Sequence, residues 1–133
     1  MSFANAHTNA ISWFEIPVAD IDRAQQFYEA VIGQSLQRQM FPMGDKVYPL
    51  AIFPSEGEGA KGCLQSGHDT QPPSTQGTVV YLSCGPSIDA AVARATAAGA
   101  SVLKPKTALP PGIGFFAHVQ DLDGNRVGLH ALA

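Results

Sequence analysis

A strand-like segment followed by an amphipathic helix occurs twice in this chain, about half a chain length apart. The first unit runs from the apolar segment 11–18 into a helix predicted from Asp20 as N-cap to Gly33 as its stop. In the second unit the helix is predicted from Ser87 as N-cap to Gly99. Both helices begin with an Ile-Asp pair and repeat apolar residues at helical spacing. This self-similarity indicates an internal duplication, and therefore two related modules.

Three short strand candidates follow each helix. They are residues 35–41, 46–53 and 61–65 in the first half, and 101–104, 114–120 and 126–132 in the second half. Each half therefore has the order β-α-β-β-β, and the predicted fold class is α+β. We interpret the 133 residues as one domain, with modules at about 10–66 and 77–133 and a polar, Pro- and Gly-rich linker at about 67–76.

Composition narrows the range of partners. The 45% hydrophobic and 14% charged residues are typical of a globular chain, and a net charge of −3 offers no basic surface for nucleic acid. No apolar stretch approaches the roughly 20 residues of a membrane helix, and residues 1–9 lack the features of a signal peptide. Cys63 and Cys84 are interpreted as reduced, packed thiols. We therefore expect a cytoplasmic protein with no nucleic-acid or membrane partner.

Alternation along three strands predicts two different faces. Val127, Leu129 and Ala131 form an apolar face that should pack under the helices. The opposite faces carry aromatic and ionisable residues, namely Trp13 and Glu15, then Phe116 and His118, then Arg126 and His130. Exposed strand faces usually carry Lys, Glu, Thr and Ser instead. The enrichment in aromatic and histidine side chains therefore suits a small-molecule pocket.

Two motifs carry a family resemblance. They are the strand-to-helix segment VADIDRAQQFYEAVIG at 18–33 and the terminal hairpin FAHVQDLDGNRVGLH at 116–130. With these motifs the chain resembles the vicinal oxygen chelate superfamily of glyoxalase I, bleomycin-resistance proteins and extradiol dioxygenases, over nearly its whole length. The resemblance implies that the sheets of the two modules curl into a mixed-sheet cup, which is usually completed in a homodimer.

The resemblance also implies where a metal would bind. In metal-dependent members four side chains at equivalent strand positions hold a divalent ion. Those positions fall on Trp13, Val79, Gly128 and the segment 62–65, which contains no carboxylate or histidine. The usual metal site is therefore expected to be missing, and no cofactor is expected.

A relocated metal site is the alternative. Glu15, His118 and His130 lie on faces that could meet in a 2-His-1-carboxylate arrangement for iron, or bind zinc or nickel. A histidine near a chain end is more often a satisfied or solvent-facing residue. We therefore favour a polar role for both histidines in a metal-free pocket.

Glu15 is the leading candidate for catalysis, because an acid within a strand covered on both faces must be paired, hydrogen-bonded or functional. It would act as a general base or recognise a polar ligand group, helped by His130 or His118. The alternative is a structural acid, bonded to a neighbouring strand or to Arg126.

Four further residues are candidates for ligand binding. Trp13, Phe41 and Phe116 are expected to form pocket walls, although core packing would explain them equally well. Arg126 could clamp an anionic group or simply be solvated. The segment 121–125 is too short for an EF-hand and is interpreted as a tight hairpin turn.

Two classes of function remain open. The chain is predicted to bind a small molecule, and it could act on that molecule as a lyase or isomerase that uses Glu15 without a metal. Alternatively, it sequesters a compound as bleomycin-resistance proteins do, or it is a metal-dependent lyase or dioxygenase with relocated ligands. A small-molecule ligand and a homodimer are the expected partners in every case.

Overall fold

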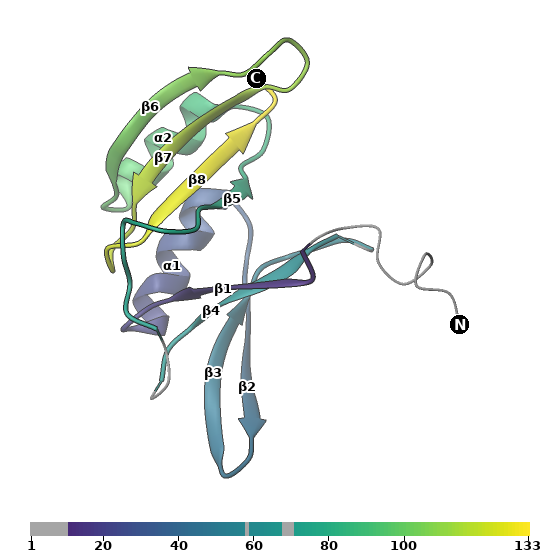
Figure 1. Ribbon diagram of the computed structural model, residues 1–133, viewed down its shortest axis with the longest axis vertical. Helices are drawn as coiled ribbons and strands as arrows, with labels where there is room; N and C mark the ends of the chain where they lie inside the picture. Colours follow the sequence, from purple (N-terminus) through teal and green to yellow (C-terminus); the bar gives the residue numbers. More distant parts are fainter. Residues whose placement is uncertain (1–10, 58, 68–70) are drawn as a thin grey trace.

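The computed structural model describes residues 11–57, 59–67 and 71–133, and shows two four-stranded sheets with one helix each (Figure 1). The first module contains β1 (Trp13–Pro17), α1 (Ile21–Ile32), β2 (Gln37–Met43), β3 (Lys46–Ile52) and β4 (Lys61–Gln65). The second contains β5 (Val80–Ser83), α2 (Ile88–Ala97), β6 (Ser101–Ala108), β7 (Phe115–Gln120) and β8 (Arg126–Ala131). The α+β class and the β-α-β-β-β order of each half are confirmed.

The two sheets share one topology. Sheet A has the strand order β1-β4-β3-β2, and sheet B has the order β5-β8-β7-β6. In each sheet the first strand pairs in parallel with the last strand of its module, while the remaining pairs are antiparallel. This repeated order is the arrangement that an internal duplication predicts. The sheets are open and do not close into a barrel.

The predicted helix limits are confirmed by their caps. The Asp20 carboxylate accepts hydrogen bonds from the backbone N–H groups of Asp22 and Arg23, and the Ser87 hydroxyl accepts one from Ala90. Gly33 ends α1 in the left-handed region, with φ of 72°.

The predicted limits differ most from the structure at strands β2 and β6. Strand β2 lies two residues further along the chain than expected. Strand β6 was predicted to end at Lys104, before Pro105, but it continues to Ala108. Because β6 is an edge strand, Pro105 can be accommodated there, and the register with β7 shifts between Lys104 and Thr107. Of the predicted linker, residues 68–70 lie outside the described residues, as do residues 1–10.

One apolar core lies between the helices and one face of each sheet. It includes Val31 of α1, Leu64 of β4, Ile88 of α2 and Leu129 of β8, all fully buried. Val127 and Ala131 are buried in the same core, so the predicted helix side of this strand is confirmed. In the described part of the chain, neither helix covers the opposite face of a sheet (Figure 1).

The β7–β8 turn joins the second module to the first. The buried Asp121 carboxylate accepts hydrogen bonds from the Tyr28 hydroxyl of α1, from the Asn125 side chain and from the backbone N–H groups of Asp123 and Asn125. Asn125 donates in turn to the Pro17 carbonyl at 2.8 Å. Burial, reinforced by Asp121, raises the pKa of Tyr28. The expected hairpin turn is present, and it also fixes how the two modules sit together.

A second connection lies at the end of α1. Arg94 of α2 donates to the carbonyl oxygens of Ala30 and Val31, which lie in the last turn of α1. That turn contains no basic residue of its own. The guanidinium therefore satisfies carbonyl groups that the helix leaves unpaired, and complements its dipole from the other module.

Candidate functional site

Sheet B places five aromatic and polar side chains on the face away from the helices. We call this the open face of sheet B. It is formed by Tyr81 of β5, Phe116 and His118 of β7, and Arg126 and His130 of β8. Gly128 lies in register between Tyr81 and His118, and because it has no side chain the Tyr81 ring can lie over it. The sequence prediction that Phe116, His118, Arg126 and His130 share one face is thus confirmed.

A hydrogen-bonded series connects three of these side chains. The Tyr81 hydroxyl lies 2.7 Å from Nε2 of His118, and Nη1 of Arg126 lies 2.9 Å from Nδ1 of the same ring. Burial, and then the nearby charges of Arg126 and Lys104, lower the pKa of His118 below its ordinary value of 6.5. The rings of Tyr81, Phe116 and His118 lie within 5.3–6.0 Å of one another.

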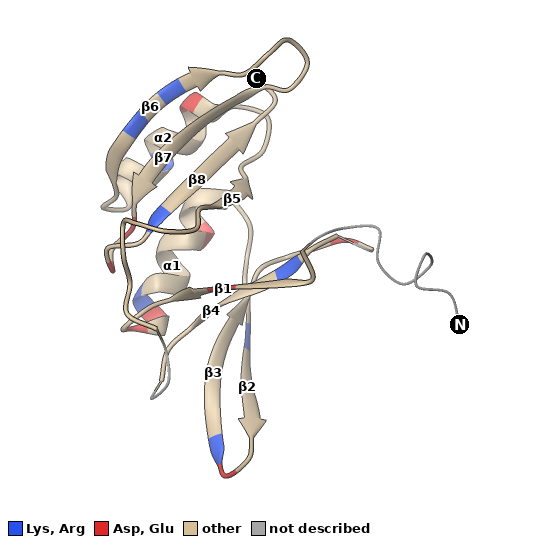
Figure 2. Ribbon diagram, viewed as in Figure 1, with Lys and Arg blue, Asp and Glu red and all other residues tan. Residues whose placement is uncertain are grey.

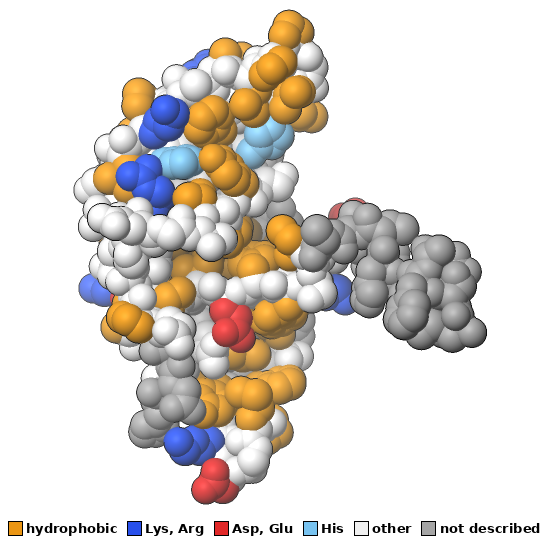
Figure 3. Space-filling view, viewed as in Figure 1, with side chains coloured by type: hydrophobic (Ala, Val, Ile, Leu, Met, Phe, Trp, Pro, Cys, Tyr) orange, Lys and Arg blue, Asp and Glu red, His pale blue; other side chains and the backbone are white. Residues whose placement is uncertain are grey.

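A pocket of about 370 Å³ opens beside this series. It is lined by Tyr81, Leu109, Ile113, Phe116 and His130. His130 is held by its Nε2, which lies 2.7 Å from the carbonyl oxygen of Ile113, so the loop before β7 forms one wall of the pocket. In the space-filling view, histidine and basic side chains lie beside hydrophobic ones over sheet B (Figure 3).

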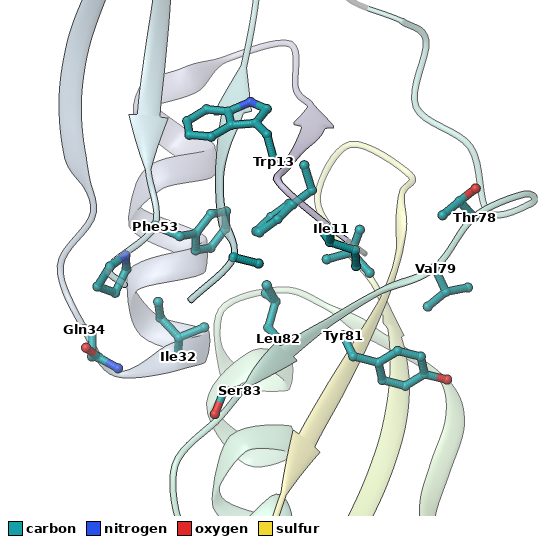
Figure 4. Close-up of a pocket in the computed structure, with 14 residues that line it drawn as sticks. Ile11, Trp13, Ile32, Gln34, Phe53, Thr78, Val79, Tyr81, Leu82 and Ser83 are labelled. Atoms are coloured by element: carbon teal, nitrogen blue, oxygen red, sulfur yellow. The ribbon is translucent and has the colours of Figure 1, made fainter. Parts of the chain in front are cut away.

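A second cavity of about 590 Å³ separates the facing edges of β1 and β5 (Figure 4). Its walls are mainly apolar and include Trp13, Phe53 and Leu82. Tyr81 lines both this cavity and the sheet B pocket, and Figure 4 shows its hydroxyl pointing away from the apolar centre. Tyr81 therefore stands at the junction of the two spaces.

Glu15 lies on sheet A and is exposed, so the expectation of an acid covered on both strand faces is wrong. With its amide nitrogen toward the carboxylate, Gln65 donates to the two oxygens of Glu15 at 2.8 and 3.2 Å. This contact matches the alternative of an acid bonded to a neighbouring strand.

Burial, followed by the charge of Glu15, raises the pKa of Cys63 to about 12, so this thiol is unreactive at neutral pH.

Glu15 and Arg126 border a small cavity of about 70 Å³ between the modules. Among the described residues no ion pair joins them. Arg126 instead donates from Nε to the Thr75 carbonyl at 3.1 Å and from Nη1 to His118. Arg126 is therefore not simply solvated. Two of its donors already bind protein atoms and are not free to hold an anionic ligand group.

The structure does not bring Glu15, His118 and His130 together. Glu15 lies on sheet A and both histidines lie on sheet B. Within the described parts of the chain, no three His, Cys, Asp or Glu side chains are grouped to hold a metal ion. At three of the four positions that the resemblance assigns to metal ligands, Trp13, Val79 and Gly128 offer no suitable donor. These residues do not fit the divalent ion of the metal-dependent members.

The predicted aromatic walls are divided between two regions. Phe116 lines the sheet B pocket and Trp13, which is 41% exposed, lines the inter-module cavity. Phe41 is 46% exposed on the β2–β3 hairpin, opposite Tyr48 in register, and borders neither space. Tyr48 is buried in a small apolar cluster with Leu50 and Cys63.

Sequence analysis missed Tyr81, which lines both spaces. The structure shows that Tyr81 occupies the same place in the second module as Glu15 in the first. Tyr81 pairs with Gly128 across β5 and β8, as Glu15 pairs with Cys63 across β1 and β4. Applying the internal duplication to the open faces would have placed Tyr81 where the first module has Glu15. Leu109 and Ile113 belong to an irregular loop, for which alternation makes no prediction.

Comparisons with known proteins agree with this fold. Residues 11–47 match the family model described as bleomycin resistance protein-like N-terminal. The chain is similar in structure to a glyoxylase/bleomycin resistance protein/dioxygenase domain from Frankia sp. EAN1pec, with a TM-score of 0.65 and 18% identity over 96% of this chain and 100% of that one. A search of curated protein sequences found no significant match.

Two further structural relatives are connected with antibiotics. An antibiotic binding protein from Streptomyces sp. CB03234 has a TM-score of 0.57 and 23% identity, over 94% of this chain and 97% of that one. A fosfomycin resistance protein from Listeria monocytogenes has a TM-score of 0.59 and 18% identity, over 94% of each chain. These likenesses show the fold. The protein has the fold of the vicinal oxygen chelate superfamily, and its residues 11–47 resemble the N-terminal part of bleomycin resistance proteins.

No helix in the described parts of the chain is long and apolar enough to cross a membrane.

Proposed function

We propose that the protein binds a small aromatic molecule on the open face of sheet B, without the divalent metal of its metal-dependent relatives. The observation that carries this proposal is the pocket of about 370 Å³, where aromatic rings and hydrogen-bonding side chains converge. Its size and its mixture of apolar walls with a few polar groups suit a compound of drug-like dimensions. The antibiotic-binding relative supports the same class of function.

A homodimer is part of the proposal. Trp13, Phe41 and Val47 leave 41–55% of their surface exposed on or near sheet A. Apolar surface of this kind is often covered by a partner, and a second copy would cover it. Sedimentation velocity should then give a mass of about twice 14.0 kDa. A monomer at micromolar concentration would contradict the proposed dimer but not the proposed ligand binding.

A ligand screen by thermal shift tests the binding function. Aromatic compounds of the right size should raise the melting temperature, and backbone amide NMR should place their effects at Tyr81, Phe116 and His130. If no compound stabilises the protein, or if the hits map to the helices, binding on this face would be rejected.

Proton transfer by Glu15 is the second candidate function, because its carboxylate is exposed and held by Gln65. This role requires a ligand that binds beside Glu15 on sheet A, outside the sheet B pocket. If such a ligand is converted by the wild type, Glu15→Gln should slow turnover by about 10²- to 10⁴-fold while binding persists. The control is Glu56→Gln, which changes an exposed loop carboxylate. If the ligand is recovered unchanged from the wild type, sequestration is the function. Equal loss of binding and turnover in Glu15→Gln would remove its proton-transfer role.

A further inference from the structure

We infer that Tyr81 is the ligand-recognising hydrogen-bond donor of the open face, held in its donor state by His118 and Arg126. Its ligand would carry an acceptor oxygen, a carbonyl or carboxylate, on an aromatic ring. This inference rests on the binding function proposed above and names the chemistry of its ligand.

The argument begins at Arg126, because a guanidinium has only donors. Its Nη1 lies 2.9 Å from Nδ1 of His118, so Nδ1 must be the accepting nitrogen of that ring. In the neutral imidazole the proton then resides on Nε2. Nε2 lies 2.7 Å from the Tyr81 hydroxyl, and it therefore donates to the phenol oxygen.

This direction leaves the O–H hydrogen of Tyr81 for a ligand. Tyr81 is 50% exposed, and His118 is the one hydrogen-bond partner of its hydroxyl among the described residues. Accepting a bond from His118 polarises the O–H group and makes it a better donor. Tyr81 lines the pocket together with Phe116, so an aromatic ligand that packs there can present an oxygen to this hydroxyl.

The cationic side chains of sheet B favour an acceptor on the ligand. His130 donates from Nε2 to the Ile113 carbonyl, so the N–H of its neutral ring is not available to a ligand. The strands of sheet B contain no acidic residue (Figure 2). Lys104 and Arg126 lie near the His118 ring, whereas Lys106 is paired with Asp89 of α2 at 3.1 Å. Lys104 lies 5.9 Å from the centre of the Phe116 ring. This charge distribution stabilises a partly negative oxygen and disfavours a cationic ligand.

The first test needs no ligand. Nitrogen-15 NMR of the side chains should show His118 with its proton on Nε2 at pH 7, and a titration midpoint below 6.5. Protonation would place an N–H on Nδ1 against Arg126, and Lys104 of β6 adds a further positive charge. The stability contributed by the neutral ring should therefore be lost as the pH falls below 6.5. Arg126→Gln should populate both tautomers and raise the midpoint. A proton on Nδ1 in the wild type would overturn the inference.

The second test uses two probes that differ in one atom type. 2-Acetylnaphthalene carries a carbonyl, whereas 2-isopropenylnaphthalene replaces that oxygen with a CH₂ group. By NMR titration the wild type should prefer the ketone by about three- to tenfold, the usual net effect of one hydrogen bond. Tyr81→Phe keeps the ring over Gly128 and should abolish this preference without weakening the hydrocarbon.

The outcomes separate this inference from the binding function. A ketone preference that survives in Tyr81→Phe would overturn the role of Tyr81 while leaving the pocket as the binding site. Equal binding of both probes by the wild type would do the same. Failure of both probes to bind would reject the aromatic carbonyl class, whereas the binding function is judged by the wider thermal-shift screen.

Discussion

Replacing Asp121 with alanine is expected to lower the free energy of unfolding by about 3–5 kcal/mol, because several buried donors lose their acceptor at once. The carboxylate is 5% exposed and accepts four hydrogen bonds, one of them from Tyr28 of the other module. Without it, the Tyr28 hydroxyl and the Asn125 amide would be left in the interior with unmet hydrogen bonds. Equilibrium unfolding in urea, followed by circular dichroism, measures the change.

The control for Asp121 is Asp45→Ala, which removes a carboxylate from the exposed end of the β2–β3 hairpin and should change stability by less than about 0.5 kcal/mol. A cycle that combines Tyr28→Phe with Asp121→Asn then isolates the contact between modules. A loss below about 1 kcal/mol for Asp121→Ala would show that the turn does not stabilise the arrangement of the modules.

The sequence predicted most of the fold because its signals are local. Asp20 and Ser87 mark helix starts through their own side chains, and Gly33 marks an end through its backbone conformation. The hairpin turn at 121–125 was predicted for the same reason, because its Asp and Gly residues favour a turn locally. Its bond to Tyr28, however, joins residues 93 positions apart, and no periodic pattern reports such a contact. Local chemistry thus located the elements, while the connection between modules needed coordinates.

The candidate site was predicted in part, and for a related reason. Alternation placed Phe116, His118, Arg126 and His130 on one face correctly, since strand geometry fixes that face. Alternation does not report how far one sheet lies from another. The interpretation of Glu15 as a covered acid, and the relocated metal site, both required sheet A to meet sheet B across their open faces. In this chain a cavity of about 590 Å³ lies between β1 and β5, and Glu15 is exposed on sheet A.

A second large effect is expected at Gly62, where alanine should lower stability by about 1–3 kcal/mol, the usual cost of overpacking a core. Gly62 is buried and pairs with Phe14 across β1 and β4, and an added Cβ would overlap the Phe14 ring. That ring cannot easily retreat, because it packs against the core and lies 5.5 Å from the ring of Phe53. Urea unfolding of Gly62→Ala measures the loss.

Gly128 provides the matched comparison, because an added Cβ there would overlap the Tyr81 ring in the same way. Tyr81 is half exposed, so its ring can swing toward solvent and relieve the overlap at a smaller cost in stability. That movement would carry its hydroxyl away from Nε2 of His118. Gly128→Ala should therefore be more stable than Gly62→Ala and yet lose the ketone preference of the wild type. If Gly128→Ala keeps that preference, Tyr81 does not depend on the open strand position beneath it. An added Cβ thus tests core packing at Gly62 and ligand recognition at Gly128. The two differ because Tyr81 lines the sheet B pocket and Phe14 does not.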